Sequence, residues 1–200
     1  SLLAIVAAVG VRERTLLQLD ISNMCINKGG ATSMASAVRN CFGLKYFNIA
    51  DNAIGSVGAN AIFQSLRRVL TLEELYVDCN GIGDSAAHAM STFIGESKCL
   101  RILSLSENEL SNDGASMIWS GIAKNDEIPL TSINFAGNKI DTAWCMSATF
   151  RTSRYLESVN LSNNILNQSS GRVFADAILP EKWGATRSLT SLDLGGNNLG

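Results

Sequence analysis

Apolar residues recur along the chain in one pattern that always begins with leucine. In each copy, further apolar residues stand at the fourth, sixth and eleventh positions, and asparagine stands at the ninth in all copies but the first. Alternation between the third and seventh positions predicts a short strand, because successive side chains of a strand point to opposite faces. Stacked copies of one unit predict a solenoid. The copies begin at Leu16, Leu44, Leu72, Leu100, Leu130, Leu156 and Leu189.

A second apolar period follows each predicted strand. In the fourth copy, Gly114 precedes Ile118 and Ile122, and apolar residues four apart mark one face of a helix. Paired strands lie about 4.8 Å apart whereas packed helices need roughly 8 to 10 Å. We therefore expect the stack to bend, with the helices on the convex side and a parallel sheet on the concave side.

The ninth-position asparagine suits a chain that leaves the sheet. Its short amide can donate and accept hydrogen bonds, and so can satisfy backbone groups in the turn. Only the first copy departs, with Met24 at this position. We predict that the amides stack into a buried structural ladder of Asn52, Asn80, Asn108, Asn138, Asn164 and Asn197.

With these motifs, the chain resembles the leucine-rich repeat superfamily. The long repeats with a second glycine or alanine block resemble its ribonuclease-inhibitor-like class. The resemblance covers nearly all 200 residues and implies an α/β fold, a horseshoe-shaped solenoid with a parallel concave β-sheet and convex helices. It says little about function, because the class includes ribonuclease inhibitors, Ran GTPase-activating proteins, sensor domains of NOD-like receptors, and cytoskeletal and axonemal proteins.

The pattern predicts one leucine-rich repeat domain over residues 1–200. Residues 1–15 occupy the place that other repeats fill with a helix, so we expect them to be the back half of a preceding repeat. The apolar stretch 1–10 is too short to span a bilayer, and no positive segment precedes it. Neither end carries the polar capping repeat that solenoids need. We therefore expect a fragment of a longer chain.

Two repeats depart from the rhythm. The fifth places Trp144 where others have glycine, and puts Ala148 and Thr152 at the inward helix positions. We expect its helix to be displaced or irregular. The sixth carries an insertion over 179–188 that contains Trp183, which would either anchor a partner or pack back on its own repeat.

Catalytic and metal-binding motifs are missing from the sequence. The five cysteines are scattered without a C-x-x-C motif, and His88 is the sole histidine. A zinc site is therefore not expected. Phosphate-binding glycine loops and the G-x-S-x-G motif are also missing. We expect no enzyme, cofactor or small-molecule substrate. Unpaired cysteines of this kind suggest a cytoplasmic protein.

The predicted concave face is acidic. Its outward positions carry two bases, Lys45 and Arg101, against eight acids, which is a net charge of −6. The whole chain carries −2, so the remainder carries +4. Such a face would repel nucleic acid and attract a protein with a basic surface. The acids are Asp20, Asp51, Glu73, Glu74, Asp78, Glu107, Glu157 and Asp193.

One cluster on that face is the candidate protein-binding site. Tyrosines and an exposed isoleucine ringed by polar groups are typical of interaction hot spots. The alternative is that aromatic residues simply suit strands. The cluster consists of Glu74, Tyr76 and Asp78 on one predicted strand, with Tyr46, Asn48, Ile102 and Ser104 on its neighbours.

These observations favour a non-enzymatic protein–protein interaction scaffold that binds a protein with a basic surface on the concave face, with no nucleic acid or membrane involved. Two alternatives remain open at this point. One is a Ran-type GTPase-activating protein, which needs neither a triad nor a metal. The other is a structural subunit of a cytoskeletal or axonemal assembly, or the sensor domain of a NOD-like receptor.

Overall fold

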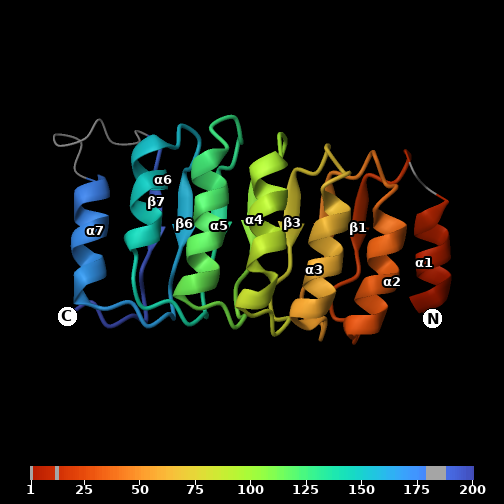
Figure 1. The fold of residues 1–200 in the computed structure, drawn as a ribbon, viewed down its shortest axis with the longest axis horizontal. Coiled ribbons are helices and arrows are strands. Elements are labelled where there is room, and N and C mark those ends of the chain that lie inside the picture. Colours follow the sequence, from red (N-terminus) through yellow and green to blue (C-terminus); the bar gives the residue numbers. More distant parts are fainter. Residues whose placement is uncertain (1, 12–13, 179–187) are drawn as a thin grey trace.

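The protein is a two-layer solenoid (Figure 1). A computed structural model describes residues 2–11, 14–178 and 188–200. One layer is a parallel sheet whose seven strands follow one another in chain order. The strands are β1 (Gln18–Asp20), β2 (Tyr46–Asn48), β3 (Glu74–Tyr76), β4 (Ile102–Ser104), β5 (Ser132–Asn134), β6 (Ser158–Asn160) and β7 (Ser191–Asp193).

Helices form the second layer and cover one face of the sheet (Figure 1). The opposite face carries the outward positions of the strands, and we keep the name concave face for it. The α-helices are α1 (Leu2–Gly10), α2 (Lys28–Val38), α3 (Gly55–Leu66), α4 (Ala87–Glu96), α5 (Asn112–Lys124), α6 (Ser147–Thr152) and α7 (Gln168–Ile178). Two 3-10 turns precede α4 and α6, namely η1 (Asp84–Ala86) and η2 (Trp144–Met146).

The core lies between the layers. Each strand contributes its central residue inward, such as Phe47 and Leu75, which are fully buried. The helices contribute residues four apart, such as Ile118 and Ile122. One continuous hydrophobic cluster results. The alternating pattern therefore predicts the inward strand residues correctly.

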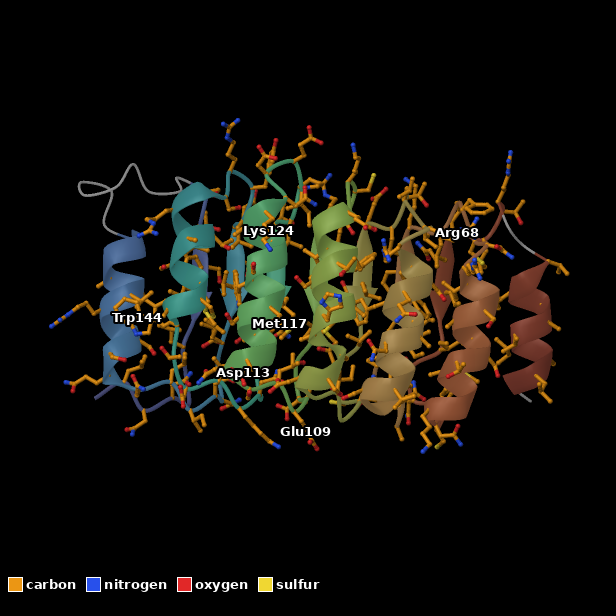
Figure 2. All side chains as sticks on the ribbon, viewed as in Figure 1. Arg68, Glu109, Asp113, Met117, Lys124 and Trp144 are labelled. Carbon is orange, nitrogen blue, oxygen red and sulfur yellow. The ribbon has the colours of Figure 1, made fainter. Side chains whose placement is uncertain are left out.

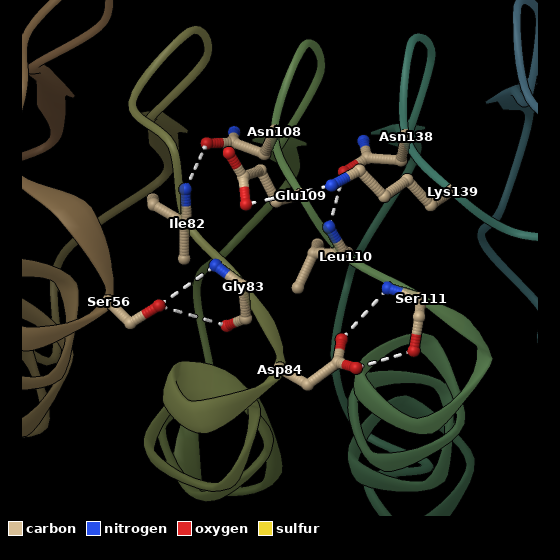
Figure 3. Close-up of polar contacts among 10 residues, drawn as sticks. All are labelled: Ser56, Ile82, Gly83, Asp84, Asn108, Glu109, Leu110, Ser111, Asn138 and Lys139. Atoms are coloured by element: carbon tan, nitrogen blue, oxygen red, sulfur yellow. Dashed lines mark hydrogen bonds and ion pairs between the residues drawn. The ribbon is translucent and has the colours of Figure 1, made fainter.

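The ninth-position amides connect consecutive turns. The Asn108 carbonyl accepts from the backbone N–H groups of Asn80 and Ile82 in the preceding repeat, at 3.1 and 3.0 Å. Its NH₂ group donates to three backbone carbonyls, including that of Leu105 at 3.1 Å. Figure 3 shows the same bond to Ile82 and the equivalent one from Leu110 to Asn138. Each amide thus satisfies groups in its own turn and in the one before.

The first turn lacks its own asparagine but is held by the second. Asn52 accepts from the backbone N–H groups of Met24 and Ile26, at 3.1 and 2.8 Å. Met24 itself points outward and is exposed. Each amide accepts from the turn before its own. The N–H groups of the first turn are therefore satisfied although Met24 stands where other repeats have asparagine.

The fifth repeat is irregular, but its inward residues differ from the expected ones. Ala148 is only half-buried, whereas Met146 and Phe150 are buried. Trp144, which stands where other repeats have glycine, is 63% exposed, and the segment starts with η2. Phe150 packs on Trp119, with ring centroids 5.7 Å apart. The prediction for Ala148 is wrong because spacing alone assumed an undisturbed helix start.

Two remaining expectations concern Trp183 and the absence of a membrane span. Trp183 lies outside the described residues. In the part of the chain that is described, no helix combines the length and apolarity needed to cross a membrane.

We predict that Asn108→Ala lowers the free energy of unfolding by at least about 3 kcal/mol, because several buried backbone groups lose their partner at once. Urea unfolding followed by circular dichroism measures this. Asn198→Ala, at an exposed residue outside the regular elements, is the control and should change stability by less than about 0.5 kcal/mol. Equal effects of the two changes would contradict a structural role for the amide.

Candidate functional site

Strand register brings the candidate residues side by side on the concave face. Tyr46 pairs with Glu74, and Glu74 pairs with Ile102. The next outward row contains Asn48, Tyr76 and Ser104. The six outward residues of β2, β3 and β4 therefore form one continuous patch.

Two tyrosines form the centre of this patch. The rings of Tyr46 and Tyr76 contact each other diagonally across β2 and β3, with centroids 5.5 Å apart and planes tilted by 43°. The Tyr76 hydroxyl donates a hydrogen bond to the Glu74 carboxylate at 2.9 Å. Both rings are half-buried. We call Tyr46, Tyr76 and Glu74 the tyrosine site.

Burial raises the pKa of Tyr76 to about 12, and the hydrogen bond and charge of Glu74 add to this rise. A raised pKa means that the folded protein favours the protonated phenol. The bond to Glu74 is therefore fully present below the usual tyrosine pKa and is lost only as pH rises through the raised value. At neutral pH the Tyr76 hydroxyl is therefore protonated and available to donate to Glu74.

Asp78 and Ser104 are engaged in internal bonds. Asp78 accepts from the Ser104 hydroxyl at 2.5 Å, and from the backbone N–H and the hydroxyl of Ser106, both at 2.6 Å. Ser104 is only 6% exposed and also accepts from the Asn134 amide at 3.1 Å. These two residues support the patch, and a partner would find little of Ser104 to contact.

Asn48 has a local role in shaping the turn. Its side-chain oxygen accepts from the backbone N–H of Ala50 at 3.0 Å, two residues on. Asn134 and Asn160 make the same contact in their own repeats. Short amide side chains commonly stabilise turns through such a bond to the backbone two residues on. Its NH₂ group also donates to Asp20 at 3.1 Å.

Ser104 takes the position of these short amides in the fourth repeat and leaves the Ser106 N–H to Asp78. Tyr76 takes the same position in the third repeat. In the fourth repeat the local turn contact is thus replaced by a contact from the neighbouring repeat. Sequence reasoning placed Asp78 in the binding cluster, and the structure assigns its carboxylate to this supporting contact.

Every repeat also has a left-handed residue at its eighth position. The φ angles there lie between 52° and 69°. Asparagine and glycine adopt this conformation readily, but other residues incur about 1 to 2 kcal/mol of strain. The apolar repeat pattern does not predict this feature, although the recurrence of asparagine and glycine at the eighth position is a visible signal for it. The residues are Asn23, Asp51, Cys79, Glu107, Gly137, Asn163 and Gly196.

Three of these residues, Asp51, Cys79 and Glu107, follow the strands that carry the candidate cluster, and we call them the acidic ridge. Burial raises the pKa of the Cys79 thiol to about 11, and so do its hydrogen bond to Asp51 and the charges of Asp78 and Glu107. The Glu107 carboxylate lies over Gly137, where a Cβ would come within 2.3 Å of it. Negative charge thus continues from the tyrosine site along the strand ends.

The ion pair on this face contributes little to stability, and its charged residues also bear on whether the face could hold a metal ion. Lys45 and Glu73 form an exposed ion pair at 2.7 Å, and such pairs contribute little stability. Within residues 2–11, 14–178 and 188–200, histidine, cysteine and acidic side chains form no group of three suited to a metal ion.

Comparison with known proteins gives the family of the repeats. A sequence model described as "Leucine Rich repeat" matches residues 40–63, 70–91, 96–118 and 186–200. No curated protein matches the sequence. Among solved structures, "Leiomodin-1 Actin-Binding Site 2 (ABS2)" is similar with a TM-score of 0.59 and 16% identity, over 72% of this chain and 82% of that chain. At this identity the similarity is one of fold.

We predict that Cys79 reacts slowly with iodoacetamide at mildly alkaline pH, because a pKa of about 11 leaves little thiolate. Asp51→Asn should speed its alkylation several-fold, since it removes a nearby charge while asparagine tolerates the left-handed backbone. Mass spectrometry of the modified peptides, with the exposed Cys25 as internal reference, measures both rates.

Asp113→Asn, which removes an exposed carboxylate from α5, is the charge-matched control and should leave the rate at Cys79 unchanged. The same rate in wild type and in Asp51→Asn would mean that Asp51 does not influence the thiol.

Proposed function

Because this chain is a leucine-rich repeat protein, we propose that it is a non-enzymatic interaction scaffold that binds a basic protein partner at the tyrosine site of its concave face. The observation that carries this proposal is the contact of Tyr46 and Tyr76 beside the Glu74 carboxylate. The faces of aromatic rings attract cations, and a carboxylate next to them adds a charged hydrogen-bond acceptor. An arginine or lysine side chain of the partner fits this combination.

The surroundings of the tyrosine site support the same partner. Ile102 lies beside Glu74 in register and is half-buried, so it adds apolar contact area. The acidic ridge extends negative charge along the strand ends, and the whole face carries a net −6. A field of one sign speeds the approach of an oppositely charged protein and disfavours wrong partners.

The later repeats offer a weaker surface. Their outward strand positions carry small residues such as Ser132 and Ser158, which supply neither large apolar area nor charge. Binding energy in interfaces is concentrated in a few large anchors, among which tyrosine and arginine are common. We therefore assign the partner to β2, β3 and β4.

We predict that Tyr46→Ala together with Tyr76→Ala removes the partner, because each lost anchor weakens binding by about 2 kcal/mol, or roughly thirtyfold. Immobilised wild-type and variant chains are incubated with cell extract, bound proteins are quantified by mass spectrometry, and the affinity of each protein lost is then measured by calorimetry. Glu74→Gln should weaken binding less and reduce its dependence on salt.

The matched control is Ser132→Ala with Ser158→Ala, which changes the same outward position on β5 and β6. It should keep the proteins that the tyrosine variant loses. If both variants retain the same set with the same affinity, or if the lost proteins are acidic, the assignment is wrong.

A cytoskeletal role is a second candidate. The observation in its favour is the similarity of fold to a domain of leiomodin-1 that binds actin. Sedimentation with actin filaments tests it directly. We expect the chain to pellet with filaments if it holds this role, and a chain that stays in the supernatant at all filament concentrations dismisses it.

A further inference from the structure

A groove runs over the helix layer on the side opposite the tyrosine site. It has a volume of about 540 Å³ and lies over α2, α3 and α4. Small residues such as Ser36, Ala61 and Thr92 line it, so neighbouring backbones leave room that larger side chains would fill. Such a volume accommodates several residues of a polypeptide and exceeds what a single ion needs.

The spacing of the helices follows from which repeats have glycine. A Cβ at Gly58 would lie 2.7 Å from the Cβ of Ala31, so glycine allows α3 to pack tightly on α2. A Cβ at Gly121 would lie 2.6 Å from the Ser91 carbonyl, so α5 packs tightly on α4. The third repeat has Ala86 where the second has Gly58, and enters its helix through η1. The α3–α4 junction therefore lacks the close glycine contact of its neighbours.

The charge of the groove is positive. Arg39 follows α2, Arg67 and Arg68 follow α3, and all three line the groove together with His88. Among the described residues that line it, none is aspartate or glutamate. Figure 2 shows Arg68 at the upper ends of the helices, on the face turned to the viewer.

One of the three arginines already has a partner within the chain. Arg67 forms a bidentate ion pair with Glu96, at 2.6 and 2.7 Å. The ion pairs found among the described residues do not involve Arg39 or Arg68. A cation after a helix C-terminus is stabilised by the helix dipole. This effect explains arginine at these positions, but it does not explain the groove beside them.

We propose that this arginine groove docks an acidic segment of a second protein partner, whose glutamate or aspartate side chains pair with Arg39 and Arg68. The planar guanidinium group binds carboxylates through two parallel hydrogen bonds, which favours arginine for this task. Because the arginines come from two helices, they fit a row of carboxylates on one polypeptide better than one isolated anion. Asn60, Gln64 and Thr92 add neutral hydrogen-bonding groups along the groove.

This site is independent of the proposed function, since it lies on the other layer and has the opposite charge. The concave face carries −6 and the rest of the chain +4. A scaffold with both surfaces would bring a basic protein and an acidic protein together.

The test uses an alanine-rich helical peptide with glutamate along one face, and the same peptide with glutamine instead. Fluorescence anisotropy with the whole chain should show binding of the glutamate peptide that weakens with salt, and none of the glutamine peptide. Arg39→Gln with Arg68→Gln should weaken binding about tenfold or more. Ser36→Trp, which fills the groove without a change in charge, should weaken it as well.

Two matched controls isolate the groove. Arg154→Gln with Arg172→Gln removes the same charge from the later repeats, and Ser33→Trp adds the same ring to α2 outside the groove. Both should bind the glutamate peptide as wild type does, and so should the tyrosine-site variant. Equal losses in the groove and control variants, or equal binding of both peptides, would overturn the proposal. So would self-association of the chain abolished by Arg39→Gln with Arg68→Gln, because the groove would then hold a second copy.

Discussion

Hydrogen bonding by the buried ninth-position amide is the interaction on which the other features of this solenoid depend. A strand of three residues must end in a turn, and the turn leaves backbone groups that cannot reach the sheet. Asn108 bonds to such groups in two successive repeats. Each amide therefore fixes the distance and rotation between neighbours as well as its own turn. The parallel register of the sheet follows, and with it the placement of every outward side chain.

The same register explains why the tyrosine site lies where it does. Tyr46 and Tyr76 are thirty positions apart in the chain, yet two paired strands bring their rings to 5.5 Å. At the position equivalent to Tyr76, other repeats carry short amides such as Asn48 and Asn134, which stabilise their own turns. Placing Tyr76 and Ser104 at that position removes those contacts, and Asp78 supplies one of them from the neighbouring repeat. The patch combines the residues of the proposed binding site with the residues that support them.

Charge separates the two layers of the protein. The strand layer gathers carboxylates at its outward positions and along the acidic ridge, whereas the helix layer gathers arginines beside a groove. The patch that contains the tyrosine site belongs to the second, third and fourth repeats, and the groove belongs to the first, second and third. The third and fourth repeats also contain Cys79 and Glu107, whose strained left-handed backbones the rigid turns maintain.

The sequence by itself determined the repeat and the inward residues, because these follow from spacing and from residue type. It also brought Tyr46, Glu74 and Tyr76 into one candidate cluster. Only the tertiary structure decided which members of that cluster remain available, since Asp78 and Ser104 are engaged by residues of adjacent repeats. The phase of α6 and the groove beside α3 also depend on packing between repeats. A periodic pattern describes one repeat at a time, whereas hydrogen bonds and close helix contacts between neighbours require their positions in space.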